Sequence, residues 1–376
     1  MWIKNGLLLN DSFSFVHADI KIEGSNITEI GKAAEDNFID ATDCYVVPGL
    51  VDTHMHAAMG KLFIDYEEDT ADVICKFEAK NGTTSLIPAI SAAPTEKMVG
   101  CISYLRRFTN KDHSGCAMIR GIHLEGPFFA EKYKGAHLPK NIRHPSIEEY
   151  KVLHQAAGED FKIITMAPEL PGADDVIPLA VADGVCVSAG HTDATAEQMK
   201  HAFSLGVSQG THTFNAMRGI GHREPGTVGA LLVEENAVCE LISDFVHVCP
   251  DIIKMVYRLK GRDKISLITD SEVGTGLPDG VYEVNGRTLT VKEGVTRTED
   301  GTIAGGSTCL ITCVRNMVSL GIPLEEACQM ATKNPATAAG IYDTCGSLTV
   351  GKHADILVLD KELNLKRVIV RGELLY

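Results

Sequence analysis

The sequence lacks a disulfide framework, a long hydrophobic run and an excess of positive charge. Its 11 cysteines are scattered without a CxxC pair, which is typical of a reducing compartment, and we expect the cytoplasm. Apolar stretches stay well short of the ~20 residues that span a bilayer, so we expect no membrane association. The formal net charge of −15 at pH 7 disfavours binding to nucleic acid or to an anionic lipid surface.

Solenoid repeats and low-complexity segments are also missing, and a different regularity takes their place. Short apolar runs recur, each followed by a segment of helical amphipathic character such as 146–158 or 195–206. Strand followed by helix, eight times in succession, is typical of a TIM-like (β/α)8 barrel of the α/β class. The expected strands lie within residues 44–52, 83–90, 117–126, 162–169, 185–191, 207–214, 238–245 and 264–270.

The two ends of the chain have a strand-like alternation instead. Neither residues 1–47 nor residues 346–376 contain enough strand to fold alone, so we expect them to pair into one small β-sandwich domain. The barrel would then occupy residues 48–345. Within it, residues 280–302 predict a β-hairpin excursion, with Asn285 and Gly286 as the turn.

Polar residues stand at the C-terminal ends of five expected strands, where the βα loops of a barrel converge. Taken alone, each histidine at a strand end would more often be a hydrogen-bonded structural residue. The carboxylate at the end of the last strand, taken alone, would more often be a helix cap. Together they predict one metal site, because imidazole and carboxylate are ligands of divalent transition ions. The six residues are His54, His56, Glu125, His191, His212 and Asp270.

The spacing of the first two histidines supports this prediction. In an extended strand, residues i and i+2 face the same side, so His54 and His56 can share one ion. We expect one or two ions per subunit, with Zn or Fe favoured and Mn or Co as alternatives. A bound ion would supply a nucleophilic water with a pKa near ~7.

Several motifs carry a resemblance to known proteins. PGLVDTHMH, LITDS and GSLTVGKHADILVLD resemble the amidohydrolase superfamily. HLEGPFF, SAGHTDAT, THTFNAM, REPG and GTIAGGS resemble, within it, the N-acetylglucosamine-6-phosphate deacetylase family. The resemblance implies hydrolysis of N-acetyl-D-glucosamine 6-phosphate to D-glucosamine 6-phosphate and acetate, in amino-sugar catabolism or cell-wall recycling.

The resemblance also implies a role for each site residue. Glu125, His191 and His212 would hold the main metal, and His54 and His56 a second ion that some members of the family lack. The catalytic base would be Asp270, which later acts as the acid. A homodimer is implied as well, with an interface residue that helps to bind phosphate.

The implied substrate contacts lie on several loops. We expect His247 to steady the acetyl carbonyl oxygen and Arg223 to bind the phosphate with its forked guanidinium group. The contacts are Ala136, His137, Asn215, Ala216, Arg223, His247, Ile303, Ala304 and Gly305.

Three alternatives stay open to different degrees. Phe245 stands where many relatives have Gly, so the galacto epimer, N-acetylgalactosamine 6-phosphate, is an alternative substrate. A catalytically silent binding protein of the same fold is less favoured, because all six candidate ligands are intact. A dihydroorotase-like enzyme is disfavoured, because Lys162 begins the fourth strand instead of ending it.

Overall fold

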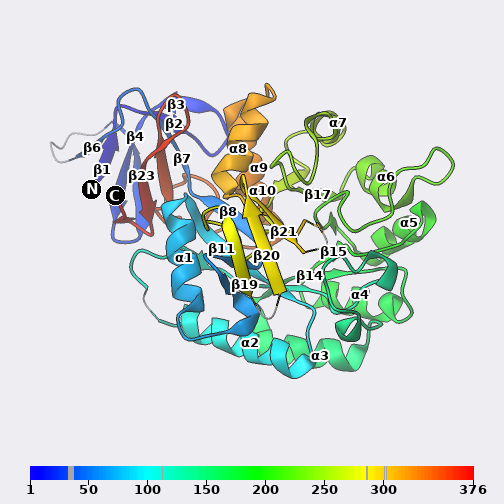
Figure 1. Ribbon diagram of the computed structural model, residues 1–376. Helices are drawn as coiled ribbons and strands as arrows, with labels where there is room; N and C mark the ends of the chain where they lie inside the picture. Colours follow the sequence, from blue (N-terminus) through cyan, green and yellow to red (C-terminus); the bar gives the residue numbers. More distant parts are fainter. Residues whose placement is uncertain (33–37, 112, 285–286, 300, 302) are drawn as a thin grey trace.

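A parallel barrel forms the centre of the molecule in the computed structural model, which describes residues 1–32, 38–111, 113–284, 287–299, 301 and 303–376 (Figure 1). Its strands pair in chain order, and a hydrogen bond of 2.8 Å from the Asp270 amide to the His54 carbonyl joins the last strand to the first. This confirms the predicted (β/α)8 fold. The strands are β8 Leu50–Met55, β11 Thr83–Ser91 (with β12 Met118–Ile119 beside it), β13 Ile122–Glu125, β14 Phe161–Met166, β15 Cys186–Ala189, β16 Gln209–Gly210, β17 Val238–Leu241 and β18 Ile265–Leu267.

The first expected strand divides into two. Residues 44–52 do not form one barrel strand, because the chain leaves one sheet at Pro48 and enters the barrel at Leu50. Gly49 is the break, and a Cβ atom there would lie 2.2 Å from Thr84 Oγ1. The close approach of the two segments therefore requires glycine at this position.

Helices pack around the barrel, and their ends follow the sequence signals. The segment 195–206 forms α5 with a complete capping box at Thr195 and Gln198, and Gly206 ends it with a φ of 112°. The apolar faces of the helices join the barrel strands in one continuous core. The helices are α1 Thr70–Lys80, α2 Thr95–Thr109, α3 Ile147–Ala157, α4 Ala173–Ala182, α5 Ala196–Leu205, α6 Gly226–Val233, α7 Pro250–Lys260, α8 Leu310–Ser319, α9 Leu324–Ala331 and α10 Lys333–Ala338.

The N- and C-terminal segments form two facing β-sheets beside the barrel (Figure 1). Apolar side chains from both sheets, including Ile3, Leu8, Ile20 and Ile356, form a separate buried core between them. The predicted small β-sandwich is therefore confirmed, while the exact domain limits stay a prediction. One sheet has the order β5 Asn26–Gly31, β4 Asp19–Glu23, β1 Trp2–Lys4, β6 Phe38–Asp40; the other has β24 Glu373–Leu374, β23 Leu365–Val370, β22 Ile356–Leu359, β7 Tyr45–Pro48, β2 Leu7–Leu9, β3 Phe15–His17.

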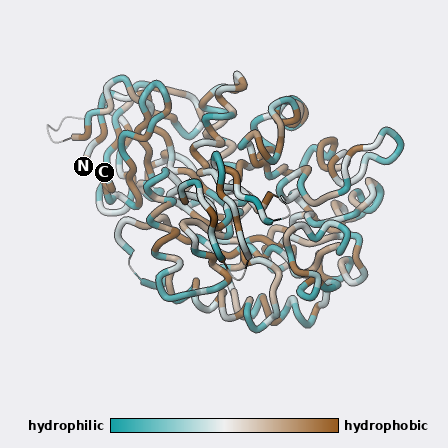
Figure 2. The backbone as a smooth tube through the Cα atoms, viewed as in Figure 1, coloured by the Kyte–Doolittle hydropathy of each residue, from teal (hydrophilic) through white to brown (hydrophobic). Residues whose placement is uncertain are grey.

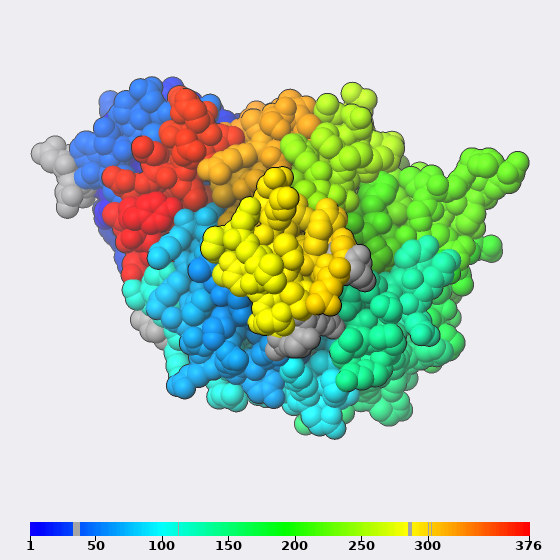
Figure 3. Space-filling model, in the orientation of Figure 1, coloured from blue at the N-terminus to red at the C-terminus, as the bar shows by residue number. Residues whose placement is uncertain are grey.

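A small antiparallel sheet projects over the barrel mouth. It consists of β19 Gly280–Val284, β20 Arg287–Lys292 and β21 Val295–Thr298, shown in yellow at the front of Figure 3. The expected turn at Asn285 and Gly286 lies outside the described residues. Two further short strands, β9 Ala57–Ala58 and β10 Lys61–Leu62, pair beside the first barrel strand.

The helices of the described ranges are all too short or too polar to cross a lipid bilayer. In Figure 2 hydrophilic and hydrophobic residues alternate along the helices that surround the barrel. That distribution is typical of elements that bury one face against a common core.

Candidate active site

Glu125 is the centre of a cluster of imidazoles at the barrel mouth. It is the last residue of β13 and is only 2% exposed. Its Oε1 atom lies 3.0 Å from His191 Nε2, 3.2 Å from His212 Nε2 and 3.4 Å from His54 Nε2. Its Oε2 atom lies 3.3 Å from His56 Nε2. One carboxylate thus faces both predicted ligand sets, which is the arrangement of a bridge between two ions.

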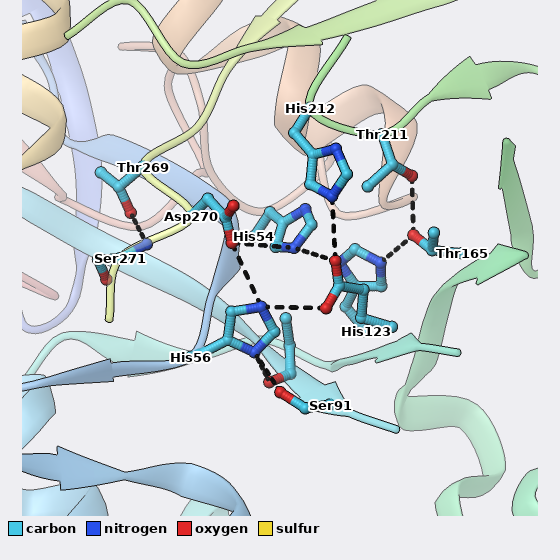
Figure 4. A network of polar contacts seen from close by, with 12 residues as sticks. His54, His56, Ser91, His123, Thr165, Thr211, His212, Thr269, Asp270 and Ser271 are labelled. Atoms are coloured by element: carbon cyan, nitrogen blue, oxygen red, sulfur yellow. Dashed lines mark hydrogen bonds and ion pairs between the residues drawn. The ribbon is translucent and has the colours of Figure 1, made fainter. Parts of the chain in front are cut away.

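Asp270 completes the cluster from the segment that follows the last barrel strand, β18. Its Oδ1 atom lies 3.5 Å from His54 Nε2 and 3.3 Å from His56 Nε2. Figure 4 shows these two imidazoles pointing toward the Asp270 carboxylate. The backbone of Asp270, His191 and His212 has a positive φ (49°, 50° and 31°). Such conformations are costly for residues other than glycine and collect at functional sites.

Hydrogen bonds to the outer ring nitrogens fix how the imidazoles face the cluster. In three of them Nδ1 lies beside a main-chain carbonyl oxygen, which can only accept, so Nδ1 carries the proton. The lone pair of Nε2 is then directed at the centre, as a metal ligand requires. The Nδ1 to oxygen distances are 2.9 Å from His56 to Ala89, 2.8 Å from His191 to Tyr133 and 3.0 Å from His212 to Asn215.

Glu240 orients the fourth imidazole, and the sequence analysis missed it. Its Oε2 atom accepts from His54 Nδ1 at 3.0 Å and from the His212 main-chain amide at 3.2 Å. Its Oε1 atom accepts from Gln209 Nε2 at 2.7 Å. A fully buried carboxylate in the middle of an apolar strand, VCEL in β17, is the signal that sequence reasoning could have used.

The nitrogen and oxygen atoms that face the centre of the cluster are suitable ligands for a divalent metal ion. His54 Nε2 is buried and has no hydrogen-bond partner among the described residues, although it faces the centre of the cluster. A buried polar atom without a partner costs free energy unless a ligand satisfies it. Among the described residues, four sets of three ligand atoms lie within 4.8 Å of one another: His54, Glu125 and His212; His54, His56 and Asp270; Glu125, His137 and His191; and His54, His123 and Glu240. Imidazole nitrogen with carboxylate oxygen suits Zn²⁺ or Fe²⁺.

The protonation equilibria of the cluster are strongly shifted by burial and by neighbouring charges. Burial alone would raise the pKa of Glu125, but the imidazoles around it, His137 first, hold that pKa well below its usual range. The pKa of Asp270 is likewise lowered, against burial, chiefly by His54. Burial lowers the pKa of His191 to about 4. Both carboxylates are therefore ionised, which metal binding and proton abstraction both require.

The cluster lies at the bottom of a cavity of about 1010 Å³. Of the predicted site residues, all except His54 and Arg223 line this cavity, and His54 lies buried beneath it. Glu272 also lines it, with its stem beside Gly305, and was not predicted. Thirteen residues that the sequence analysis named are thus brought to one cavity: His56, Glu125, Ala136, His137, His191, His212, Asn215, Ala216, His247, Asp270, Ile303, Ala304 and Gly305.

Arg223 lies elsewhere. It is exposed on the segment before α6, which projects from the barrel in Figure 1 and is hydrophilic in Figure 2. Arg223 is not one of the described residues that line the cavity of its own chain. The structure therefore does not bring Arg223 together with the other predicted contacts.

His247 and Phe245 occupy one turn after β17, but they face different surroundings. Burial alone would lower the pKa of His247, but a 2.7 Å hydrogen bond from Nδ1 to Asp244 outweighs it and raises that pKa. Because Nδ1 of the ring is held by Asp244, the other face of the ring is directed at the cavity, whose wall includes His247. Phe245, with a φ of 68°, packs against the main core and is not part of the described cavity wall. Its side chain therefore does not narrow the cavity.

His123 supports the cluster from below and is not one of its ligands. Its Nδ1 atom lies 3.0 Å from the Thr53 carbonyl and its Nε2 atom 2.7 Å from Thr165 Oγ1. Figure 4 shows the contact continuing from Thr165 to Thr211. Both ring nitrogens are satisfied inside the barrel, and burial lowers the pKa of the ring, so His123 is neutral.

Known proteins resemble this chain along almost its whole length. A model of the amidohydrolase family matches residues 45–375. An N-acetylglucosamine-6-phosphate deacetylase of Vibrio furnissii is 34% identical over 88% of this chain and 83% of its own. An N-acetylgalactosamine-6-phosphate deacetylase of Escherichia coli O157:H7 is also 34% identical, over 87% and 86%.

Solved structures of N-acetylglucosamine-6-phosphate deacetylases are also similar to this chain. A mutant N-acetyl-D-glucosamine-6-phosphate deacetylase of Mycobacterium smegmatis, in complex with N-acetyl-D-glucosamine-6-phosphate, superposes with a TM-score of 0.93 at 32% identity. The match covers 100% of this chain and 99% of that one. The N-acetylglucosamine-6-phosphate deacetylase of Thermotoga maritima gives a TM-score of 0.90 at 29% identity, over 100% and 99%.

Proposed function

The chain belongs to the amidohydrolase family, and from that premise we propose that it deacetylates N-acetyl-D-glucosamine 6-phosphate with the help of a divalent metal. The products are D-glucosamine 6-phosphate and acetate. The observation that carries the proposal is the central position of Glu125, whose Oε1 atom lies within 3.4 Å of Nε2 of His191, His212 and His54 and whose Oε2 atom lies 3.3 Å from His56 Nε2.

The metal-holding residues are those whose Nε2 or carboxylate atoms face the centre of the cluster. We assign the main ion to Glu125, His191 and His212, and a second ion to His54 and His56 with Glu125 as the bridge. Zn or Fe suits these ligands best, with Mn or Co as alternatives. When bound, the metal polarises the acetyl carbonyl and lowers the pKa of a water molecule to about 7.

Asp270 moves the proton. As an ionised carboxylate at the edge of the cluster, it takes a proton from the attacking water and later gives it to the leaving amine nitrogen. One group can serve both steps because the two transfers occur at neighbouring atoms of the same intermediate.

Donors on the far side of the mouth hold the substrate. His247, whose pKa is raised by its hydrogen bond to Asp244, donates to the acetyl oxygen as negative charge develops on it. His137, whose Nε2 atom lies 3.1 Å from Glu125, positions the sugar beside the cluster. Asn215 and Ala216 line the same cavity; the Asn215 main-chain amide already donates to the His212 carbonyl oxygen at 2.9 Å, so we assign the Ala216 amide as the neutral donor for a phosphate oxygen.

We assign Arg223 to the cavity of a second copy of the chain, because it projects away from its own. A homodimer would place its guanidinium group on the phosphate that the partner binds. Mixing Asp270→Asn protein with Arg223→Ala protein tests this assignment. Hybrid dimers would hold one site with both groups intact, so activity above either parent is expected. If the activity of the mixture is no greater than the sum of the activities of the two parent variants, Arg223 does not act in the partner's site.

The test of the whole proposal is amine release from N-acetyl-D-glucosamine 6-phosphate, with the galacto epimer measured beside it. Fast turnover of the gluco compound is the expected result. Preference for N-acetyl-D-galactosamine 6-phosphate would keep the mechanism and change the sugar, since relatives of both kinds share 34% identity with this chain. Bound metal without turnover of either compound would refute the proposal and leave a binding protein.

A further inference from the structure

A single loop contacts the ligands that we assign to the main ion. It begins after Glu125, the last residue of β13, and continues to Arg143 without a strand or an α-helix. The Ala130 amide donates to the His191 carbonyl oxygen at 2.9 Å, and the Tyr133 carbonyl oxygen lies 2.8 Å from His191 Nδ1. The loop is therefore held against one ligand of the ion, His191, and its start is fixed by another, Glu125.

His137 is the side chain of this loop that points back to the cluster. Its Nε2 atom lies 3.1 Å from Glu125 Oε2, and its ring centroid lies 4.8 Å from that of His191. The His137 side chain is 11% exposed. One ligand atom from each of Glu125, His137 and His191 lies within 4.8 Å of the other two. These three side chains are thus as closely grouped as the sets that contain His54.

The ligands assigned to the main ion leave a place for one more. Nitrogen and oxygen atoms bound to a tetrahedral Zn²⁺ at about 2.1 Å lie about 3.4 Å from one another. The three pairs among Glu125 Oε1, His191 Nε2 and His212 Nε2 are 3.0, 3.2 and 3.1 Å apart, which fits one face of a tetrahedron. His137 Nε2 approaches the second oxygen of the same carboxylate at 3.1 Å. It is therefore placed to supply a fourth ligand atom.

The outer ring nitrogen distinguishes His137 from the other four imidazoles. Nδ1 of His54 is held by Glu240, and Nδ1 of the remaining three is held by main-chain carbonyl oxygens. In the part of the chain that the structure describes, no group forms a hydrogen bond with His137 Nδ1. These residues therefore do not fix the tautomer of His137, so its Nε2 can offer a lone pair to an ion or an N–H group to a sugar oxygen. His137 is an exchangeable ligand where the other four are fixed.

We propose that His137 Nε2 is a fourth ligand of the main ion in the substrate-free enzyme, and that the phosphorylated amino sugar displaces it. A catalytic metal site keeps one position open, and four protein ligands would close it. His137 also lines the cavity, where the proposed function gives it to the sugar, so it leaves the ion when the sugar binds. The ligation requires only the metal, whereas the displacement rests on the proposed function.

The zinc affinity of the metal-free protein, measured by chelator competition with no sugar present, tests the ligation. His137→Ala removes the imidazole. His137→Gln also removes it but keeps an N–H group that can donate to Glu125 Oε2. We expect both variants to bind the main ion about tenfold or more weakly than the wild type. A His137→Gln affinity within about threefold of wild type would overturn the proposal, because His137 would then act only as a hydrogen-bond donor to Glu125.

His201→Gln is the matched control for these two variants. His201 lies on α5, where its Nε2 atom is 3.2 Å from Asp174 Oδ1, and it is not among the described residues that line the cavity. It is also an imidazole beside a carboxylate, so its replacement should leave the zinc affinity unchanged. The metal-free variants should unfold at the same Tm as the metal-free wild type, which shows that the change in affinity does not come from a loss of folding.

The visible absorption of the Co²⁺-loaded protein tests the displacement, because it depends on the number and type of the ligands. The probe is D-glucosamine 6-phosphate, the proposed product, which the enzyme does not consume. We expect the wild-type and His137→Ala spectra to differ without the sugar and to converge when it is added. Identical spectra without the sugar would overturn the ligation, and bound sugar that leaves the wild-type spectrum unchanged would overturn the displacement. Either result leaves the proposed function intact, whereas no turnover of the N-acetyl compound would refute that function.

Discussion

Glu78 is a buried carboxyl group that the proposed mechanism does not use, and it makes a quantitative prediction about stability. It lies in α1 with 0% exposure, and neither carboxyl oxygen has a hydrogen-bond partner among the described residues. Burial, with a smaller contribution from the negative charge of Asp52, raises the pKa of Glu78 from its usual 4.5 to about 8. The folded protein therefore holds a proton at pH 7 that the unfolded chain releases.

The sign of the effect follows from proton linkage. An acid whose pKa is raised by folding binds more protons in the folded state, so stability falls as pH rises from about 4.5 to about 8. One pKa unit corresponds to about 1.4 kcal/mol, so at pH 7 the shift costs on the order of 3 kcal/mol. Glu78→Gln keeps the shape of the neutral acid and removes the linked proton. We therefore expect the variant to be about 3 kcal/mol more stable at pH 7 and nearly equal to the wild type at pH 4.

Thermal or urea unfolding between pH 4 and pH 8 measures the difference. With an unfolding entropy of about 2.1 cal/mol/K per residue and 376 residues, 3 kcal/mol corresponds to a Tm increase of about 4 °C at pH 7. Glu235→Gln, at an exposed loop position, is the matched control and should show no such pH dependence. A Glu78→Gln variant whose stability difference from wild type is constant with pH, or that is less stable at pH 8, would refute the reasoning.

Four further predictions concern the site. Asp270→Asn should keep its metal, measured by elemental analysis, but lose about 10²–10⁴-fold in kcat; an active variant would remove Asp270 as the base. Glu240→Gln should weaken metal binding about 10–100-fold in chelator competition, because the carboxylate orients His54; unchanged affinity would contradict that role. Glu272→Gln should lower KM for the phosphorylated sugar about two- to tenfold, because it removes a negative charge from the cavity; a higher KM would mean that Glu272 binds the sugar. Removing the metal should lower the Tm, since an ion that binds only the folded state stabilises it; equal Tm values would argue against a buried site.

The fold and most of the candidate site could be predicted because their signals are local. Strand and helix alternation depends on the spacing of apolar residues, and the capping box at Thr195 begins helix α5 where the pattern predicts it. The cluster residues stand at strand ends, so a ring of parallel strands brings them together without further information. Glu240 was missed because a single charged residue within an apolar strand does not reveal which imidazole it contacts.

The sequence by itself determined the barrel, the terminal β-sandwich and the set of candidate ligand side chains, because each follows from periodicity and residue type along the chain. Only the tertiary structure decided which side of the mouth each residue faces. Arg223 stands beside cavity residues in the sequence yet projects away from them, and Phe245 turns into the core. Both outcomes depend on loop backbone angles, such as the φ of 68° at Phe245, that result from packing among distant segments.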